Sequence, residues 1–227
     1  MKIIAIILAR GGSKGIPRKN IKEINGIPLI NYTINQCIEA GIKDIYTSSD
    51  DNEILKIAEN AGSSLIQRPK DISDDLATSE SGWLHAIENI NELDFANDWI
   101  FAPQVTSPIR ESFDIENGMK IALSNNYDSI FSAVRFEDFF IWERKSDQYL
   151  PINYDYKNRL RRQDIENHTY LENGSFYLFK GSGIKKYNNR LHGKIGICEM
   201  DKTKMFQIDS LEDILIVESI LAKLQIK

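Results

Sequence analysis

The sequence predicts an α/β protein, a three-layer sandwich in which helices cover both faces of a mostly parallel central sheet. The first observation is an unbroken apolar, β-branched run at residues 3–9, which is typical of a strand buried on both faces. The second is that strand-like and helix-like patterns alternate over most of the chain. Such alternation produces parallel strands joined by helices that pack on the sheet.

The first half of the chain continues from this strand with helices and strands in turn. After a turn at Asn25-Gly26, Pro28 can start a helix that ends at Gly41. The apolar stripe of this helix consists of Ile30, Ile34, Cys37 and Ile38. Strands follow at residues 42–48 and 63–66. Between them we expect a helix with Asp50 as its cap and Glu53 three residues later.

The second half keeps this alternation up to residue 134 and resumes it after about residue 170. The expected elements are a helix carrying Trp83, Ile87 and Ile90, a strand at 99–102, a helix carrying Ile115, Met119 and Leu123, and strands at 129–134, 175–179 and 195–200. A final helix starts at about Ser210, with an apolar face formed by Leu211, Ile214, Leu215, Leu221 and Leu224.

Residues 135–170 interrupt the alternation. Aromatic and charged residues are dense here, and the aromatic ones include Phe139, Phe140, Trp142, Tyr149, Tyr154 and Tyr156. Exposed aromatic side chains at this density often mark a partner surface. We therefore predict a single domain over residues 1–227 with an inserted β-ribbon or arm at residues 135–170, through which two copies form a homodimer.

Composition limits the class of protein. A chain of 227 residues with 42% hydrophobic residues can bury one substantial core. Cys37 and Cys198 lie in apolar segments without paired or metal-binding spacing, so we expect reduced core residues. No leader peptide and no membrane-spanning run is seen, which predicts a cytoplasmic protein without a membrane partner. The net charge of −5 argues against nucleic-acid binding, whereas basic clusters at residues 10–19 and 157–162 suit small anionic ligands.

The glycine-rich segment after the first strand, Arg10 to Gly15, is the candidate site. Ligands of open α/β sheets bind beyond the carboxyl ends of strands. Glycines let backbone N–H groups approach phosphate oxygens, and Arg10, Lys14 and Lys19 add positive charge. The spacing fits neither a P-loop nor a dinucleotide fingerprint. The alternative is an ordinary tight turn with solvated charges.

Residues 8–20, Leu-Ala-Arg-Gly-Gly-Ser-Lys-Gly-Ile-Pro-Arg-Lys-Asn, closely resemble the signature of the acylneuraminate cytidylyltransferase family, which comprises CMP-sialic acid synthetases and their legionaminic and pseudaminic acid relatives. Further blocks agree in order at residues 67–69, 104–110, 162–164, 172–177 and 208–210. The resemblance covers nearly the whole chain. It implies that the predicted fold is Rossmann-like, of the nucleotide-diphospho-sugar transferase type.

The reaction that the resemblance implies joins CTP to a nonulosonic acid, a nine-carbon 2-keto-3-deoxy sugar acid. Its anomeric hydroxyl attacks the α-phosphate and gives CMP-sugar and diphosphate, with Mg²⁺ or Mn²⁺ as cofactor. Two alternatives stay open: a nucleotidyltransferase for another triphosphate or another acidic sugar such as Kdo, and a non-catalytic nucleotide-binding or sugar-binding relic of the fold. The choice among Neu5Ac, legionaminic and pseudaminic acid is also open, because no spacing rule locates the groups that face C5, C7 and C8.

The resemblance also implies residue roles. Arg10, Lys19 and Asp209 are the expected catalytic residues, and Asp209 is the expected metal ligand. The other expected nucleotide contacts are Leu8, Ala9, Gly11, Gly12, Ser13, Lys14, Gly15, Asn20, Arg68 and Ser81. The expected sugar contacts are Gln104, Arg162, Gln163, Asn173 and Tyr177, among which an arginine suits the sugar carboxylate by bidentate pairing.

Several of these residues have a structural alternative. Arg68 can be a solvated loop residue, Tyr177 a core residue, Gln104 a partner of local backbone, and Asp209 a cap of the final helix.

The metal site departs from the family pattern. Many relatives carry two aspartates one residue apart near the last helix, whereas this chain has Gln207-Ile208-Asp209. One carboxylate with phosphate and water oxygens can hold Mg²⁺. The three histidines lie outside the matching blocks, and no general base stands out. We therefore expect either metal-assisted deprotonation or Asp209 itself to activate the sugar hydroxyl.

Overall fold

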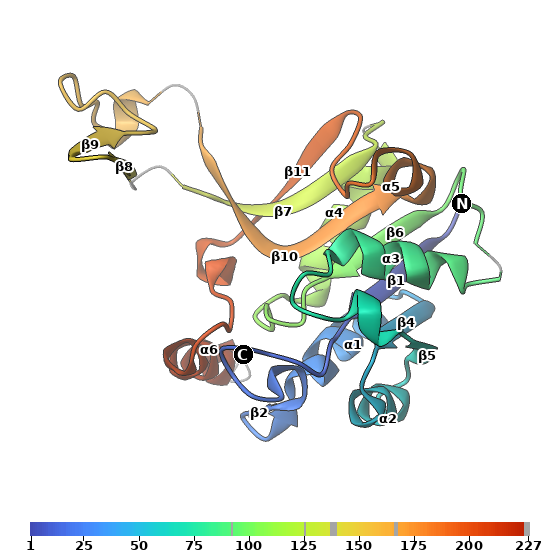
Figure 1. The fold of residues 1–227 in the computed structure, drawn as a ribbon. Helices are drawn as coiled ribbons and strands as arrows, with labels where there is room; N and C mark the ends of the chain where they lie inside the picture. The colour runs from blue at the N-terminus through green and yellow to red at the C-terminus, as the bar shows by residue number, and fades with distance from the viewer. Residues whose placement is uncertain (92, 125, 137–139, 166–167, 225–227) are drawn as a thin grey trace.

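The computed structural model describes residues 1–227 apart from 92, 125, 137–139, 166–167 and 225–227. Its centre is a seven-stranded sheet with the strand order β11-β7-β10-β6-β1-β4-β5 (Figure 1). The strands are β1 (Ile3–Leu8), β4 (Asp44–Ser49), β5 (Ser64–Gln67), β6 (Trp99–Pro103), β7 (Ser129–Arg135), β10 (Tyr170–Lys180) and β11 (Ile195–Met200). Only β10 runs antiparallel to its neighbours, β6 and β7. The predicted mostly parallel sheet is confirmed.

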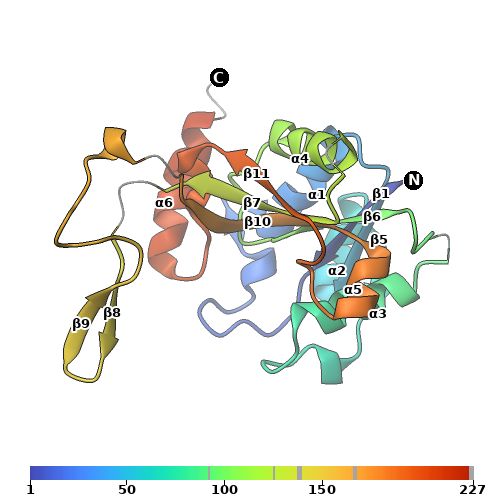
Figure 2. The same cartoon turned by 90° about the horizontal axis from the view of Figure 1, so that it is seen from above.

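Helices cover both faces of this sheet, which gives the three layers that the alternating pattern predicts (Figure 2). One core cluster packs helices α1 (Leu29–Glu39), α2 (Asn52–Asn60), α4 (Ser112–Ser124) and α6 (Leu211–Leu224) on one face. The other packs α3 (Ser79–Glu88) and α5 (Gly181–Tyr187) on the opposite face. Strand β1 sends Ala5 and Ile7 into the first cluster and Ile4 and Ile6 into the second. Burial on both faces explains why this strand is apolar throughout.

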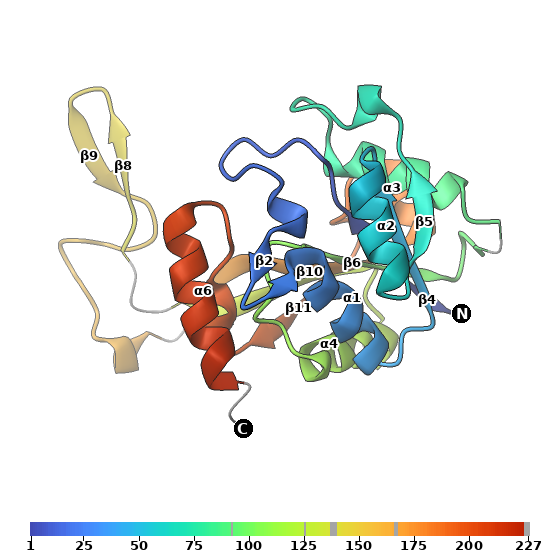
Figure 3. The same ribbon diagram turned by 90° about the horizontal axis from the view of Figure 1, so that it is seen from below.

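Short elements complete the described chain. Strands β2 (Glu23–Ile24) and β3 (Ile27–Pro28) form a small hairpin (Figure 3), and the 3-10 helices are η1 (Lys19–Ile21), η2 (Lys70–Ile72), η3 (Arg162–Asp164) and η4 (Lys202–Met205). Asn25 and Gly26 have φ values of 48° and 77°, the left-handed pair that a two-residue hairpin turn requires.

The N-terminal cap of α2 differs from the residue that the sequence predicts. Asp51, rather than Asp50, caps α2, because its carboxylate accepts hydrogen bonds from the backbone N–H groups of Glu53 and Ile54 at 2.9 and 3.1 Å.

The apolar faces of three helices are narrower than the sequence predicts. Helix α6 buries Ile214, Val217 and Leu221. The expected core residues Leu211 and Leu215 are instead 61% and 68% exposed, and Ile38 and Leu123 are 48% and 49% exposed. These side chains lie at the edges of their apolar stripes, so the contact with the sheet does not reach them.

The predicted insertion at residues 135–170 lies between β7 and β10, and its first and last residues, Arg135 and Tyr170, still pair with each other in the central sheet. Strands β8 (Trp142–Lys145) and β9 (Gln148–Pro151) form their own antiparallel sheet, which stands away from the central sheet in all three views (Figures 1–3). A β-ribbon is therefore present, and its exposed apolar residues include Trp142, Tyr149, Leu150, Ile152 and Tyr156. Phe139 lies outside the described residues. The role of this arm in dimerisation stays a prediction.

Both cysteines are free and buried, as expected for reduced core residues. Across the residues that the structure describes, no helix has the length and hydropathy needed to span a membrane.

Candidate active site

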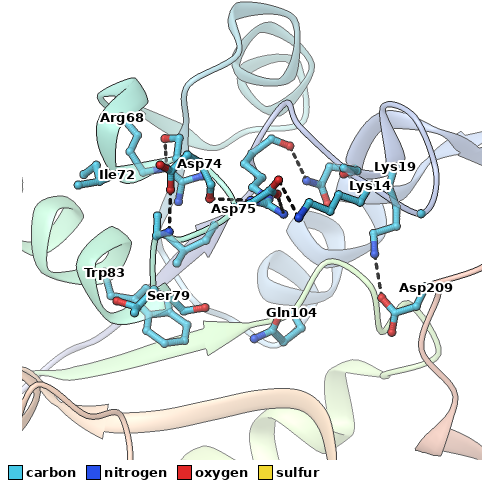
Figure 4. A pocket seen from close by; sticks show the side chains of 18 of the residues that line it. Lys14, Lys19, Arg68, Ile72, Asp74, Asp75, Ser79, Trp83, Gln104 and Asp209 are labelled. Carbon is cyan, nitrogen blue, oxygen red and sulfur yellow. Dashed lines mark hydrogen bonds and ion pairs between the residues drawn. The ribbon is translucent and has the colours of Figure 1, made fainter.

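A cavity of about 480 Å³ opens at the carboxyl ends of β1 and β6, where ligands of open α/β sheets bind (Figure 4). The glycine-rich loop, the segment from Arg68 to Ser79 and the end of β6 surround it. The expected site residues that line it are Leu8, Arg10, Ser13, Lys14, Gly15, Lys19, Asn20, Arg68, Gln104 and Asp209. The structure thus brings together residues that are up to 201 positions apart in the chain, from Leu8 to Asp209, and most of them are polar.

Close approaches fix the path of the glycine-rich loop. The backbone N–H of Gly11 donates to Asp50 Oδ1 at 2.9 Å, so Asp50 holds this loop instead of capping α2. A Cβ at Gly11 would lie 2.8 Å from Asp51 Oδ2, and one at Gly15 would lie 2.5 Å from the carbonyl oxygen of Asp209. Gly12 has no heavy atom within 4 Å of such a Cβ, so its backbone borders open space. The two ends of the loop need glycine for packing, and its middle stays accessible to a ligand.

Three cations form ion pairs at the cavity, two from the glycine-rich loop and the third, Lys19, from η1. Asp75 accepts from Arg10 Nη2 and from Lys14 Nζ, each at 2.9 Å, and Lys19 Nζ lies 2.9 Å from Asp209 Oδ1 (Figure 4). The hydrogen bond from Lys14 lowers the pKa of Asp75 below its usual value. Such solvent-exposed pairs contribute little stability. A polyanionic ligand can therefore replace Asp75 without breaking the fold.

Sequence reasoning did not identify Asp74 and Asp75. Arg10 Nη1 donates to the backbone carbonyl of Asp74 at 2.7 Å, and the Asp74 carboxylate accepts from the N–H groups of Leu76 and Ala77. These aspartates belong to no spacing rule for phosphate or metal sites. The available signal was two adjacent acidic residues placed shortly after Arg68-Pro69.

Asn20 and Arg68 are buried at the back of the cavity. Asn20 Nδ2 donates to the carbonyl oxygen of Arg10 at 2.9 Å, which ties the loop to η1. Arg68 Nε donates to Ser73 Oγ at 3.0 Å, and the side chain is only 5% exposed. Burial lowers the pKa of Arg68. The structural alternative of a solvated Arg68 is therefore wrong.

The predicted contact of Ser81 differs from the observed arrangement. Ser81 Oγ donates to the carbonyl oxygen of Thr78 at 2.7 Å, and Thr78 Oγ1 accepts from the N–H of Ser81 as the cap of α3. Thr78 and Ser79 line the cavity, whereas Ser81 does not. The hydroxyl groups nearest a ligand thus lie two and three residues earlier than expected.

On the sheet side of the cavity, the wall is built from Trp83, Pro103 and Gln104. The Gln104 amide lies below Lys14 and Asp75 in the view of Figure 4, and it forms no side-chain hydrogen bond with the described residues. We call Trp83, Pro103 and Gln104 the acceptor wall, because Gln104 is the expected contact of the sugar that accepts the cytidylyl group. Its free amide can donate to or accept from a bound hydroxyl or carboxylate.

Tyr177 lies behind this wall and is 6% exposed. Its ring meets Trp83 edge-on with centroids 6.4 Å apart, and its hydroxyl donates to Glu172 Oε1. Burial, helped by Glu172, raises the pKa of Tyr177 to about 12. The guanidinium of Arg190 covers the rings of Trp83 and Tyr177, with its central carbon 4.6 and 4.8 Å from their centroids. Tyr177 supports Trp83 from the core in this structure.

Asn173 is 1% exposed and fully engaged inside the protein. Its Nδ2 donates to the carbonyl oxygen of Lys204 at 3.0 Å, while its Oδ1 accepts from Ser132 Oγ at 2.6 Å and from the N–H of Ser175 at 3.2 Å. These bonds join β10 to β7 and η4. The structure therefore corrects the expectation that Asn173 lines the cavity, because its amide is satisfied within the core.

Arg162 and Gln163 both lie in η3 on the arm. Gln163 is exposed and is not among the residues that line this cavity. The side chain of Arg162 lies outside the described part of the chain.

The expected metal site offers one carboxylate, that of Asp209, as a ligand for a metal ion. Asp209 is 72% exposed and lines the cavity, with one oxygen paired to Lys19. Gln207 points elsewhere, since its Nε2 donates to the carbonyl oxygen of Asn173 at 2.7 Å. Among the described residues, no group of three or more His, Cys, Asp or Glu side chains could hold a metal ion. This arrangement suits a Mg²⁺ that takes most of its oxygens from phosphates and water.

Comparison with known proteins gives a consistent result. Residues 4–214 match the family model described as cytidylyltransferase. An N-acylneuraminate cytidylyltransferase of Oncorhynchus mykiss is 35% identical over 188 residues, which cover 81% of this chain and 42% of that protein. A pseudaminic acid cytidylyltransferase of Campylobacter jejuni is 30% identical over 220 residues, which cover 94% of both. The chain therefore spans less than half of the fish protein and nearly all of the Campylobacter protein.

A solved structure shares the fold. The structure of a CMP:2-keto-3-deoxy-manno-octonic acid synthetase complexed with CTP aligns with a TM-score of 0.73 and 14% identity, covering 98% of this chain and 99% of that one. The predicted fold type is confirmed by this match.

Proposed function

This chain belongs to the cytidylyltransferase family, and from that premise we propose that it transfers the cytidylyl group of CTP to the anomeric hydroxyl of a nonulosonic acid. The observation that carries the proposal is the cavity itself, which Arg10, Lys14 and Lys19 line together with the free amide of Gln104. In Figure 4 this amide lies below Lys14. The relatives named as N-acylneuraminate and pseudaminic acid cytidylyltransferases support an acidic nine-carbon sugar as the acceptor.

In the proposed reaction the sugar hydroxyl oxygen bonds to the α-phosphorus, and the bond from this phosphorus to the oxygen bridging to the β-phosphorus breaks. Diphosphate leaves with the bonding electrons, and the hydroxyl proton is released. Negative charge grows on the diphosphate, where Arg10, Lys14 and Lys19 stabilise it. Because Asp75 occupies two of these cations in the structure, CTP binding has to displace its carboxylate.

We assign Asp209 as the protein ligand of a Mg²⁺ or Mn²⁺ ion that accompanies CTP. Such an ion neutralises phosphate charge and acidifies a coordinated hydroxyl. Asp209 suits this role because its carboxylate is exposed toward the cavity and next to Lys19. Asp209 does not cap α6 with its side chain: the bonds at the start of that helix join Ser210 and Asp213.

The acceptor contacts in this proposal come from Gln104, with Trp83 and Tyr177 as the supporting surface. Arg162 and Gln163 lie in η3 on the arm, and Gln163 is not among the residues that line the cavity of its own chain. We propose that the arm joins two copies in a homodimer and brings these residues to the neighbouring copy. The exposed Trp142, Tyr149 and Ile152 are the surface that such an association would bury.

A cytoplasmic location is part of the same proposal. The free, buried Cys37 and Cys198 fit a reducing compartment.

Diphosphate release tests the proposed activity. Purified protein is mixed with CTP, Mg²⁺ and, one at a time, Neu5Ac, legionaminic acid, pseudaminic acid and Kdo. Release of diphosphate with one of the nonulosonic acids supports the proposal. Release with Kdo alone would mean that the enzyme uses another acidic sugar as its acceptor. CTP binding without turnover on any of them would contradict it and favour a non-catalytic relic.

A further inference from the structure

Arg110 lies beneath the acceptor wall with its side chain enclosed in the protein. It lies in the loop that connects β6 to α4 and is 2% exposed. Burial lowers the pKa of the guanidinium to about 10, so it still carries its charge at neutral pH. A buried charge is costly unless hydrogen bonds satisfy it. Its partners therefore indicate what the arginine does.

The guanidinium is held by neutral oxygens. Nη1 donates to the carbonyl oxygen of Ser175 at 2.7 Å and to the Ser175 hydroxyl at 3.2 Å, while Nη2 donates to Thr33 Oγ1 in α1 at 3.2 Å. Arg110 forms no ion pair with any described carboxylate. The nearby Asp114 is paired with Lys204, at 2.6 Å. The forked arginine thus bridges β10 and α1.

Ser175 connects this arginine to the cavity. Its carbonyl oxygen also accepts a hydrogen bond from the backbone N–H of Gln104 at 2.9 Å. Ser175 lies where the pairing of β10 with β7 shifts register, between Glu172 and Tyr177. The shift lies on the side of β7, whereas the Ser175 carbonyl bonds to Gln104 next to the regular pair of Phe176 and Pro103 on the side of β6. Arg110 Nη1 gives the same carbonyl oxygen a second hydrogen bond.

We propose that Arg110 is a positioning residue for the acceptor sugar, because it fixes the Ser175 carbonyl that holds Gln104 in the acceptor wall. The inference rests on the proposed function, in which Gln104 contacts the sugar. A lysine has a single nitrogen and cannot hold both Ser175 and Thr33 in this fork. Removing the fork would free the backbone of Gln104 while leaving the glycine-rich loop in place.

Hydrogen exchange of the Gln104 amide tests the geometric part without any substrate. We expect faster exchange at this amide in Arg110→Lys than in the wild type. Thr33→Val is the matched control, since it removes the other acceptor of the same guanidinium and leaves Ser175 intact. It should lower the melting temperature and leave the Gln104 amide at the wild-type rate. Unchanged exchange in Arg110→Lys, or equal acceleration in both variants, would overturn the proposal.

Steady-state kinetics with the acceptor found in the diphosphate assay tests the functional part. We expect Arg110→Lys to raise KM for the sugar roughly tenfold, about the value of one hydrogen bond, with KM for CTP unchanged. If the effect passes through Gln104, then adding Arg110→Lys to Gln104→Ala should cause no further rise. Additive effects, or a parallel rise of KM for CTP, would contradict the positioning role. If the wild type turns over none of the sugars, the proposed function fails, and the exchange experiment still decides whether Arg110 fixes Gln104.

Discussion

The two sides of the cavity are held in different ways. On the loop side, Arg10 and Lys14 are paired with a single exposed aspartate, and Lys19 with Asp209. On the acceptor side, Gln104 rests on bonds that are buried: Ser175, Arg110 and Asn173 are each no more than 2% exposed. Exposed pairs exchange partners readily, whereas buried networks are costly to disturb. The loop side is therefore suited to accept a polyanion, and the acceptor side is suited to keep one shape.

The largest expected effect is on the loop side. Arg10→Ala should reduce kcat by about 10²-fold or more, because a donor that stabilises the transition state is lost. Steady-state kinetics with saturating CTP measures this. A change confined to KM for CTP would mean that Arg10 contributes only uniform binding.

Asp209→Asn tests the metal assignment at the junction of the two sides. We expect a fall in kcat of about tenfold or more at fixed Mg²⁺, together with a higher Mg²⁺ concentration for half-maximal rate. Titration of the rate with Mg²⁺ measures both. A rate near that of the wild type at saturating Mg²⁺ would contradict a role of Asp209 in activating the sugar hydroxyl.

On the acceptor side, the effect of breaking a buried bond should appear as lost stability. Asn173→Ala leaves the Ser132 hydroxyl and the Lys204 carbonyl without their partner and should lower the free energy of unfolding by about 1–3 kcal/mol. Urea denaturation measures the difference. Gln163→Ala, an exposed change on the arm, is the control and should stay within about 0.5 kcal/mol of the wild type. Equal stability of all three proteins would show that the buried amide is dispensable.

The smallest effect is expected at Asp75. Asp75→Asn removes a negative charge that CTP must displace, so the Kd for CTP should fall a few-fold, as for the loss of weak exposed pairs. Calorimetry at low and high salt would show the difference shrinking as salt screens the charges. Weaker CTP binding by the variant would instead indicate that Asp75 contributes directly to the bound complex.

Much of the fold could be predicted from the sequence because the strands are buried on both faces and the helices on one. The run at residues 3–9 and the stripe around Ile30 and Ile34 report this burial directly. The cap of α2 could not be placed to the residue, since Asp50 and Asp51 are adjacent and either can cap a helix. Only the structure shows that one holds the helix and the other holds Gly11.

The part of the site formed by one contiguous segment could be predicted from the sequence. The orientation of side chains whose partners are distant in the sequence could not. The glycine-rich loop is a contiguous motif, so the sequence could place Arg10, Lys14 and Gly15 at the cavity, whereas their roles stay predictions. Asn173 and Arg110 belong to equally recognisable blocks, yet no pattern tells whether a polar side chain points to a ligand or into the core. That choice is made by distant partners, such as Lys204 for Asn173 and Thr33 for Arg110.

The contact between Gly15 and Asp209 has a consequence for how the protein is made. The ion pair next to it joins Lys19 to a residue 190 positions later, and the glycine backbone leaves no space for a side chain against the Asp209 carbonyl. During synthesis β1 leaves the ribosome before Asp209, and this corner of the cavity has no partner until Asp209 has also emerged. The side of the cavity at Gly15 therefore forms late in folding, because it depends on a contact between distant parts of the chain.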